Sequence, residues 1–270
     1  YAKQAKVIHL ELDPSEINKN VKANVAVLGD CKESLAKLTQ AITAKKHAAW
    51  MGKFRTLEQQ ENEEVVQHDL MPTKVGLTMG EVIHHINRYK ADDAVMVTDV
   101  GQHQMIAWRY FNYKKTRTQV TSGGLGTMGF ALPAALGAQL HDYSRQVICV
   151  VGDGGIQMTI QELGTIMQTK APVKIVLLNN NYLGMVRQWQ QLFFDKRYSF
   201  TELDNPDFIK LAEAYSIKAQ KVSDRAGLAE AVEDMFIHDG PFFLEVVVEK
   251  EDNVFPMIAT GSSVEEVRLH

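Results

Sequence analysis

The stretch from Val147 to Gly184 constrains the fold of this chain more than any other part of the sequence. Two continuous apolar runs, Val147–Val151 and Val173–Leu178, flank an amphipathic helical pattern over Ile156–Met167. Continuous apolar runs are typical of parallel strands that are buried on both faces of a sheet. A β-α-β unit usually takes about 30 residues or more. The stretch therefore predicts two parallel strands joined by a helix.

Polar residues follow both predicted strands directly, as Gly152–Gly154 after the first and Asn179–Asn181 after the second. Parallel strands end at one edge of a sheet, where α/β proteins bind ligands. Asp153 and Asn180 are therefore expected to project into one crevice. A carboxylate and an amide oxygen suit Mg²⁺ or Ca²⁺, and Mg²⁺ leaves its other positions to water and phosphate.

Flanking glycines let backbone N–H groups approach an anion closely. Either motif by itself is more often a structural turn or loop. Because the two motifs follow adjacent predicted strands, we interpret the stretch as a Mg²⁺-diphosphate clamp.

Composition excludes several function classes. The 270 residues are 45% hydrophobic and 23% charged, so a full core is available. A net charge of -4 without long blocks of one sign gives no indication of a nucleic-acid partner. The sequence contains neither an apolar run of membrane-helix length nor a signal-peptide core, so no membrane association is expected. Cys31 and Cys149 make no disulfide framework, which indicates a reducing compartment. Because the sequence shows no targeting segment, we expect a cytoplasmic, bacterial-like location.

The alternation of predicted strands and helices indicates an α/β fold, a doubly wound and mostly parallel sheet with helices on both faces. One of these helices is expected to run over Pro206–Tyr215, with Asn205 as its N-cap. The chain starts without Met and enters a strand almost at once, so we expect a piece of a longer or processed protein. Four segments are predicted: residues 1–44 as the C-terminal remnant of a preceding α/β domain, 45–76 as a linker, 77–250 as the main domain and 251–270 as a tail.

A glycine cluster offers an alternative function. Gly124–Gly129 fits the G-x-G-x-x-G pattern between a predicted strand and a helix, which is typical of dinucleotide-binding sites. Such a site needs an acidic residue about 20 positions further on. Asp142 has nearly that spacing, but it lies in a polar turn. We therefore rank this interpretation below the Mg²⁺-diphosphate clamp.

Three further side chains are candidates for the same crevice. Gln102 and His103 follow a predicted strand end, where they could donate to phosphate oxygens at a helix N-terminus. Met128, inside the glycine loop, could support a bent cofactor, although most Met residues simply fill gaps in a core. Trp189 could form one wall of a substrate pocket or pack against a neighbouring subunit.

With these residues placed, the chain resembles the acetohydroxyacid synthase (acetolactate synthase) family of thiamine-diphosphate enzymes. That family carries a GDG-to-NN signature, which Gly152–Gly154 and Asn179–Asn180 match with 27 residues between Asp153 and Asn180. The resemblance covers essentially the whole chain. Further similar motifs are VGQHQ at 100–104, SGGLGTMG at 122–129, LGMVRQWQ at 183–190 and PMI at 256–258.

The resemblance implies a role for each matching residue. Asp153, Asn180 and the backbone carbonyl of Tyr182 are implied to hold Mg²⁺. Gly126 is implied to meet the aminopyrimidine ring of the cofactor, and Met128 to keep the cofactor bent. The tail from Phe255 onward is implied to help close the site. The implied cofactor contacts also include Val100, Gly101, Gln102, His103, Gly152, Gly154, Gly155, Leu183, Gly184 and Met185, and the implied substrate contacts are Met185, Val186 and Trp189.

The same resemblance implies a reaction in branched-chain amino acid biosynthesis. Pyruvate is decarboxylated, and its two-carbon unit is condensed with a second 2-oxo acid, either pyruvate or 2-oxobutyrate. The family uses a glutamate from an N-terminal domain that this sequence does not contain, so no catalytic residue is assigned here and the chain alone is expected to be inactive. Also implied are FAD in the full-length enzyme, a homodimer or tetramer, and a regulatory small subunit.

Other functions stay open from the sequence. Within the same cofactor class, the chain could belong to a simple 2-oxo acid decarboxylase or oxidase. From other classes, it could be a nucleotide-binding oxidoreductase domain or an interaction module that binds no cofactor.

Overall fold

The computed structural model describes residues 4–270, which divide into two compact units. The first unit comprises residues 4–60 and 258–267, and the second comprises 61–257 and 268–270. The domain boundaries expected near residues 44, 76 and 250 stay predictions.

The first unit is small and contains no buried side chain among its described residues. β1 (Ile8–Glu11) and β2 (Val25–Leu28) pair in parallel. α1 (Cys31–Ala41) begins after Asp30, whose side chain accepts a hydrogen bond from the backbone N–H of Lys32 at 2.8 Å. Without buried apolar surface, this unit gains little stability from the hydrophobic effect by itself. Its other elements are η1 (Pro14–Glu16) and most of α2 (Ala48–Glu61).

The segment expected as a linker is largely helical. α2 continues into a π-helical turn, η2 (Asn62–Val66), and then into α3 (Gln67–Leu70). The rings of Trp50 and Phe54 pack edge to face on α2, with centroids 4.4 Å apart. Both rings remain exposed, so this aromatic pair packs mainly against itself.

The second unit is built on a six-stranded sheet in which every neighbouring pair is parallel. The strand order is β4-β3-β5-β6-β8-β7, which confirms the predicted doubly wound α/β fold. β5 and β6 are buried along their whole length, as their continuous apolar sequences predicted. The strands are β3 (Val95–Thr98), β4 (Gln119–Thr121), β5 (Val147–Gly152), β6 (Lys174–Asn179), β7 (Lys218–Val222) and β8 (Phe242–Val247).

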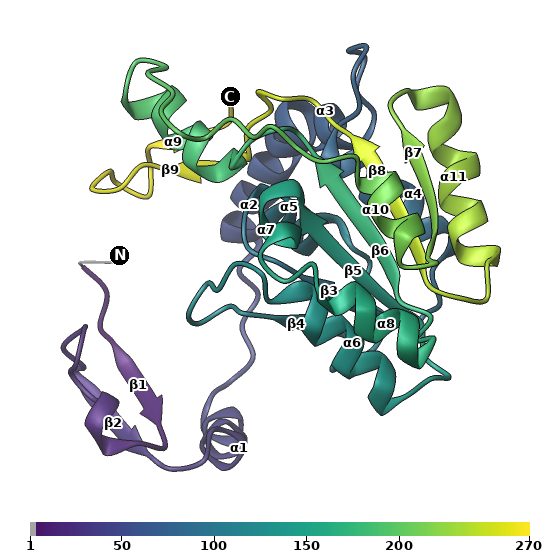
Figure 1. Ribbon diagram of the computed structural model, residues 1–270. Helices are drawn as coiled ribbons and strands as arrows, with labels where there is room; N and C mark the ends of the chain where they lie inside the picture. Colours follow the sequence, from purple (N-terminus) through teal and green to yellow (C-terminus); the bar gives the residue numbers. More distant parts are fainter. Residues whose placement is uncertain (1–3) are drawn as a thin grey trace. The chain divides into compact units, whose positions relative to one another are not determined.

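Helices cover both faces of this sheet (Figure 1). Alternate residues of each strand point to opposite faces, so Ile148 joins one apolar core and Cys149 the other. The first core lies under α4 (Met79–Tyr89), α5 (Gln102–Tyr110) and α11 (Arg225–Ile237). The second lies under α6 (Ala131–His141), α8 (Glu162–Thr169) and α10 (Phe208–Ala214).

The strand order creates a crevice beside β3. β3 pairs with β4 on one side and with β5 on the other. The connection from β3 to β4 therefore runs toward one edge of the sheet, and the connection from β4 to β5 runs toward the opposite edge. Ligands of open α/β sheets bind outside the carboxyl ends of the strands at such a switch point. The fold therefore directs a ligand to the loops that follow β3, β5 and β6.

The prediction of one continuous helix over Ile156–Met167 is wrong, because the structure has two shorter helices there. α7 (Asp153–Gln157) ends early, and α8 starts after a turn over residues 158–161. Within this turn, the hydroxyl of Thr159 donates to the carbonyl oxygen of Gly129 at 2.8 Å. The break thus places the turn against the glycine loop, a tertiary contact that helical periodicity does not reveal.

The predicted start of α10 is also wrong. α10 begins at Phe208, and its N-cap is Asp207, whose carboxylate accepts from the backbone N–H of Lys210 at 3.1 Å. Asn205 therefore caps no helix. Its side chain points instead to Asp153, at the end of β5.

The two apolar cores should account for most of the stability of the second unit. Leu177 in β6 is fully buried in the second core. Leu177→Ala is expected to lower the free energy of unfolding by about 2–5 kcal/mol, because it removes apolar contacts and leaves a cavity. Urea denaturation followed by circular dichroism measures this change. Val75→Ala, at a side chain that is 96% exposed, is the control and should stay within about 0.5 kcal/mol of the wild type. Equal effects of the two substitutions would contradict the assignment of the core.

Candidate functional site

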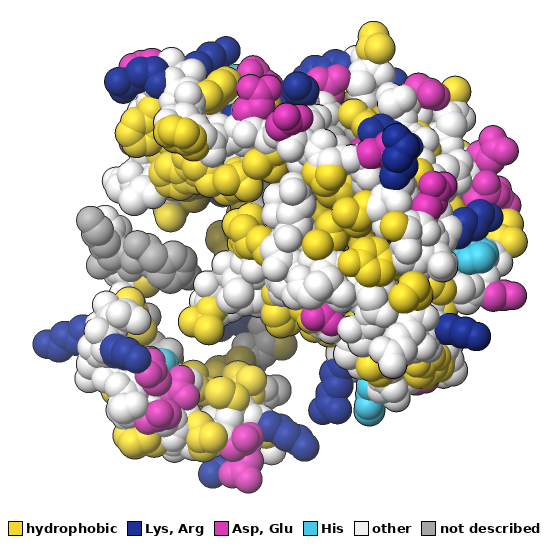
Figure 2. All heavy atoms as spheres, in the orientation of Figure 1, with side chains coloured by type: hydrophobic (Ala, Val, Ile, Leu, Met, Phe, Trp, Pro, Cys, Tyr) yellow, Lys and Arg dark blue, Asp and Glu magenta, His cyan; other side chains and the backbone are white. Residues whose placement is uncertain are grey.

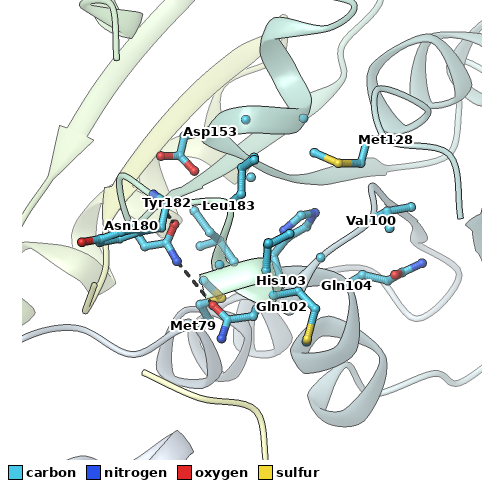
Figure 3. Close-up of a pocket in the computed structure, with 18 of the residues that line it drawn as sticks. Met79, Val100, Gln102, His103, Gln104, Met128, Asp153, Asn180, Tyr182 and Leu183 are labelled. Carbon is cyan, nitrogen blue, oxygen red and sulfur yellow. Dashed lines mark hydrogen bonds between the residues drawn. The ribbon is translucent and has the colours of Figure 1, made fainter. Parts of the chain in front are cut away.

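A cavity of about 280 Å³ lies at the carboxyl ends of β3, β5 and β6. Figure 3 shows Asp153, Asn180, His103 and Met128 around it. The register of the sheet explains this convergence, because Gly152 of β5 pairs with Leu178 of β6. Asp153, which directly follows Gly152, and Asn180, which directly follows the last residue of β6, therefore leave the sheet side by side.

Asp99 organises the first loop of the site. Its carboxylate is buried and accepts hydrogen bonds from the backbone N–H groups of Val100 at 2.8 Å and Gly129 at 2.9 Å. Burial raises the pKa of Asp99, while these N–H groups and those at the start of α6 favour the charged carboxylate. Asp99 thereby ties the glycine loop to the end of β3.

The glycine loop passes close to its neighbours at Gly129. This residue has φ of +82°, and a Cβ there would lie 2.9 Å from Cβ of Met158. A side chain at this position would be strained both by the backbone conformation and by the contact. The sequence patterns gave Asp99 no role, although an Asp that directly follows a buried strand is a visible signal.

His103 lies in the first turn of α5, packed against the end of β5. A Cβ at Gly152 would lie 2.9 Å from its Nδ1, so the ring occupies space that only a glycine leaves free. The ring is 6% exposed, and Nε2 has no hydrogen-bond partner within the described chain. Burial lowers the pKa of His103 to about 4, which keeps the imidazole neutral near pH 7. A neutral imidazole with an unused nitrogen, beside the N-terminus of α5, fits a phosphate oxygen as its partner.

Asp153 is the first residue of α7 and is 1% exposed. Burial raises the pKa of its carboxyl to about 6, while a hydrogen bond from Asn205 and nearby backbone N–H groups act in the opposite direction. The Nδ2 of Asn205 lies 2.7 Å from Oδ2 of Asp153. A buried carboxylate without a buried cation beside it is costly, and a bound metal ion would offset that cost.

Asn180 lies in a tight turn that follows β6. Its Oδ1 accepts from the backbone N–H of Tyr182 at 3.1 Å, and its Nδ2 donates to Oε1 of Gln102 at 3.4 Å (Figure 3). Asn181 adopts the left-handed conformation with φ of +56°, which asparagine tolerates better than most residues. The turn directs the backbone through Tyr182 and Leu183 along the cavity wall.

The donor set of the cavity fits a hard divalent cation. Asp153, Asn180 and Tyr182 line the cavity, and Mg²⁺ commonly combines carboxylate, amide and carbonyl oxygens with water and phosphate. Among residues 4–270, no group of three or more His, Cys, Asp or Glu side chains is arranged to hold a metal.

The structure brings most of the predicted site residues together. All of the residues that the sequence assigned to the cofactor, metal or substrate line the cavity except Gly126 and Trp189. Gly126 lies in the exposed part of the glycine loop, with φ of +62°. Trp189 lies on α9 (Gly184–Phe193), is 39% exposed and packs against Phe193 with ring centroids 4.9 Å apart. In Figure 2, hydrophobic side chains gather over the region of α9.

Four residues that line the cavity were not predicted from the sequence. Met105 lies one helical turn after Gly101, and this spacing could have revealed it. The other three are Met79, Gln104 and Leu178. Met79 comes from the start of α4, which no local motif connected to the site.

The structure does not place Asp142 where a dinucleotide site at the glycine cluster would need its acidic residue. Asp142 follows the C-terminal end of α6, roughly 16 Å of helix away from the glycine loop. Its carboxylate is bound to the backbone N–H and the hydroxyl of Ser144, which lower its pKa. It therefore lies too far from the loop to meet a ribose held there.

The first part of the predicted tail is tied to the site by polar contacts. Gln102 donates through Nε2 to the carbonyl oxygen of Asp252 at 2.9 Å and to Oε1 of Gln188 at 2.8 Å. Gln188 also accepts from the backbone N–H of Val254 at 2.9 Å. The buried guanidinium of Arg187 donates to the same carbonyl of Asp252. These bonds fix residues 252–254 beside α5 and α9, whereas closure of the site by the tail from Phe255 onward stays a prediction.

No helix among residues 4–270 is both long and apolar enough to cross a membrane.

Comparisons with known proteins agree on one family. Residues 99–246 match the thiamine pyrophosphate enzyme family, in its C-terminal TPP binding domain. The chain is 40% identical over 99% of its length to the acetolactate synthase isozyme 2 large subunit of Escherichia coli, and 41% identical over 100% to the acetolactate synthase large subunit of Lactococcus lactis. It is 39% identical over 96% to the mitochondrial acetolactate synthase catalytic subunit of Saccharomyces cerevisiae. These matches cover 47%, 46% and 38% of the relatives, so the chain spans about half their length or less.

The buried imidazole of His103 should make stability depend on pH. Its folded pKa of about 4 lies below the unfolded value of about 6.5. Between these pH values His103 is protonated in the unfolded chain but neutral in the folded chain. The free energy of unfolding therefore falls as the pH is lowered from 6.5 toward 4. In His103→Gln, the fall in the free energy of unfolding over this pH range should be smaller by roughly 3 kcal/mol. Urea titrations at pH 7.0 and 4.5 measure it, and equal pH slopes in the two proteins would contradict a neutral, buried His103.

Proposed function

The chain belongs to the thiamine pyrophosphate enzyme family, and from this premise we propose that its cavity binds that cofactor through Mg²⁺. Thiamine pyrophosphate is also called thiamine diphosphate, the name used below. The observation that carries the proposal is the convergence of Asp153, Asn180 and His103 on one cavity at the switch point of the sheet. Asp153, Asn180 and the Tyr182 carbonyl hold Mg²⁺. His103 donates to the diphosphate, together with the backbone of Val100, Gly101, Gln102, Gly154 and Gly155.

The remaining lining residues position the organic part of the cofactor and the substrate. The backbone of Gly126 meets the aminopyrimidine ring, and the Met128 side chain supports the bent cofactor from one side. Met185, Val186 and Trp189 line the approach of the substrate. When bound, thiamine diphosphate supplies the electron sink for decarboxylating a 2-oxo acid, while the protein supplies position and electrostatics.

We propose further that the chain is part of an acetolactate synthase large subunit. Identity of about 40% along nearly the whole chain to proteins of that name supports this assignment. The substrates are then pyruvate and a second 2-oxo acid, either pyruvate or 2-oxobutyrate. These relatives are named as large subunits, which supports assembly with a regulatory small subunit. FAD binding, a homodimer or tetramer and a cytoplasmic location complete the proposal.

Cofactor binding tests the first proposal directly. Calorimetric titration of the full chain with thiamine diphosphate should show binding that requires Mg²⁺, and Asp153→Ala should weaken it at least 100-fold, because the variant removes the one carboxylate of the donor set. Asp142→Ala, at the far end of α6, is the matched control and should bind like the wild type. NADH binding that is indifferent to Asp153 would favour the oxidoreductase, and no binding of either cofactor would favour an interaction module.

Product analysis tests the second proposal. The natural protein that contains this chain, given Mg²⁺, thiamine diphosphate and pyruvate, should release acetolactate rather than acetaldehyde. Asp153→Ala should lower kcat/KM at least 100-fold through lost cofactor binding. Acetaldehyde as the main product of the wild-type protein would assign the chain to a simple decarboxylase instead.

A further inference from the structure

A series of hydrogen-bonded polar side chains, most of them buried, runs from β8 to the back of Asp153. We propose that Glu245 is a positioning residue that fixes the orientation of the Asp153 carboxylate through two asparagines. The two asparagines are Asn179, at the end of β6, and Asn205, in the loop before α10. This inference rests on the proposed function, because the carboxylate that it orients is the proposed Mg²⁺ ligand.

Each link of this chain is a short hydrogen bond. Glu245 accepts through Oε1 from Nδ2 of Asn179 at 2.8 Å. The Oδ1 of Asn179 accepts from Nδ2 of Asn205 at 3.2 Å. That same Nδ2 donates to Oδ2 of Asp153 at 2.7 Å. Glu245 therefore reaches the proposed metal ligand through two amide groups.

The carboxylates at the two ends of this series, Glu245 and Asp153, decide the direction of every donor between them. A carboxylate only accepts hydrogen bonds, so Asn179 must turn its NH₂ group toward Glu245. The Asn179 oxygen then faces Asn205, which must offer its NH₂ group in turn. Asn205 consequently donates to Oδ2 of Asp153, and Oδ1 is the oxygen that this amide does not occupy.

A second set of bonds supports the same orientation. The Oδ1 of Asn179 also accepts from the backbone N–H of Asn181 at 3.1 Å. The Oδ1 of Asn205 accepts from Nε2 of Gln157 at 3.0 Å. Reversing either amide would place two donors or two acceptors face to face. The arrangement thus has one favoured polarity, which the carboxylate of Glu245 sets at its buried end.

Glu245 is an unusual residue for its place in the sheet. It lies on β8 between β6 and β7, opposite Leu177 and Lys221, and is 2% exposed. Its cationic partner, Lys221, lies 2.9 Å away, but 52% of that side chain is exposed. An ion pair so placed is weak support for stability, and an apolar pair would often serve the core as well. The bond from Asn179 gives this buried carboxylate a role that an apolar side chain could not perform.

The loop that carries Asn205 is held in place independently. The backbone N–H of Leu183 donates to the carbonyl of Thr201 at 2.8 Å, and that of Leu203 donates to the carbonyl of Asn181 at 2.9 Å. The loop therefore runs beside the turn that follows β6. These contacts keep Asn205 within reach of both Asn179 and Asp153, whichever residue occupies position 245.

Metal affinity tests the inference. With saturating thiamine diphosphate, the full chain is titrated with Mg²⁺ and binding is followed calorimetrically. Glu245→Gln should weaken Mg²⁺ binding about 10–100-fold, the usual effect of losing a partner that orients a metal ligand. Asn205→Ala should weaken it to a similar extent. Asp204→Asn, at the exposed neighbouring position, is the control and should keep the wild-type affinity.

A double-mutant cycle separates positioning from general damage to the fold. If Glu245 acts through Asn205, adding Glu245→Gln to Asn205→Ala should change Mg²⁺ affinity by less than about twofold. If the losses of Mg²⁺ affinity in the two single variants instead multiply in the double variant, Glu245 does not act through Asn205. The electron paramagnetic resonance spectrum of bound Mn²⁺ gives a second readout, since it should change in both single variants and match the wild type in Asp204→Asn.

The remaining outcomes distinguish the two levels of proposal. Loss of binding in Asp153→Ala, with wild-type affinity in Glu245→Gln and Asn205→Ala, would overturn the positioning role and leave the proposed function intact. Absence of Mg²⁺-dependent binding in the wild type would overturn both. If Glu245→Gln does not fold, as judged by circular dichroism, Asn205→Ala in its half-exposed loop decides the matter.

Discussion

The parallel pairing of β3, β5 and β6 is the constraint on which the rest of the site depends. Parallel strands release their following residues at one edge, and the register sets which of these residues become neighbours. Because Gly152 pairs with Leu178, Asp153 and Asn180 leave the sheet together. The loop after β3 joins them because β3 pairs directly with β5. A slip of one residue in either pairing would exchange the faces of the strand and separate these groups.

The edge of the sheet concentrates polar groups that would be costly elsewhere in a core. Asp99, Asp153 and Glu245 are all nearly inaccessible to water. Asp99 is satisfied by the backbone N–H groups of the glycine loop, and Glu245 by Lys221 and Asn179. Asp153 accepts from Asn205, and its raised pKa reflects burial without a buried cation. Of these three carboxylates, Asp153 is the one that we propose as a metal ligand.

Local sequence patterns predicted the elements but misplaced some of their ends. The apolar runs of β5 and β6 identified buried strands, because only parallel strands under two helical layers need such sequences. The break between α7 and α8 was not predicted, because it depends on a contact between Thr159 and Gly129. Asn205 was misread as a helix cap for a related reason. An Asn before Pro suits a cap in sequence terms, yet here the amide is engaged by Asp153 from another part of the fold.

The sequence by itself determined the fold class, the cofactor family and most residues of the cavity, because these follow from strand patterns and from motifs at strand ends. Only the tertiary structure decided how the buried polar groups are satisfied. The bonds of Asp99 to the glycine loop, and of Glu245 to Asn179, join residues that are distant in sequence. No local pattern encodes such bonds, since their geometry arises from strand order and register. The same reason explains why Gly126 and Trp189, placed by motif, lie outside the cavity wall that the packed chain forms.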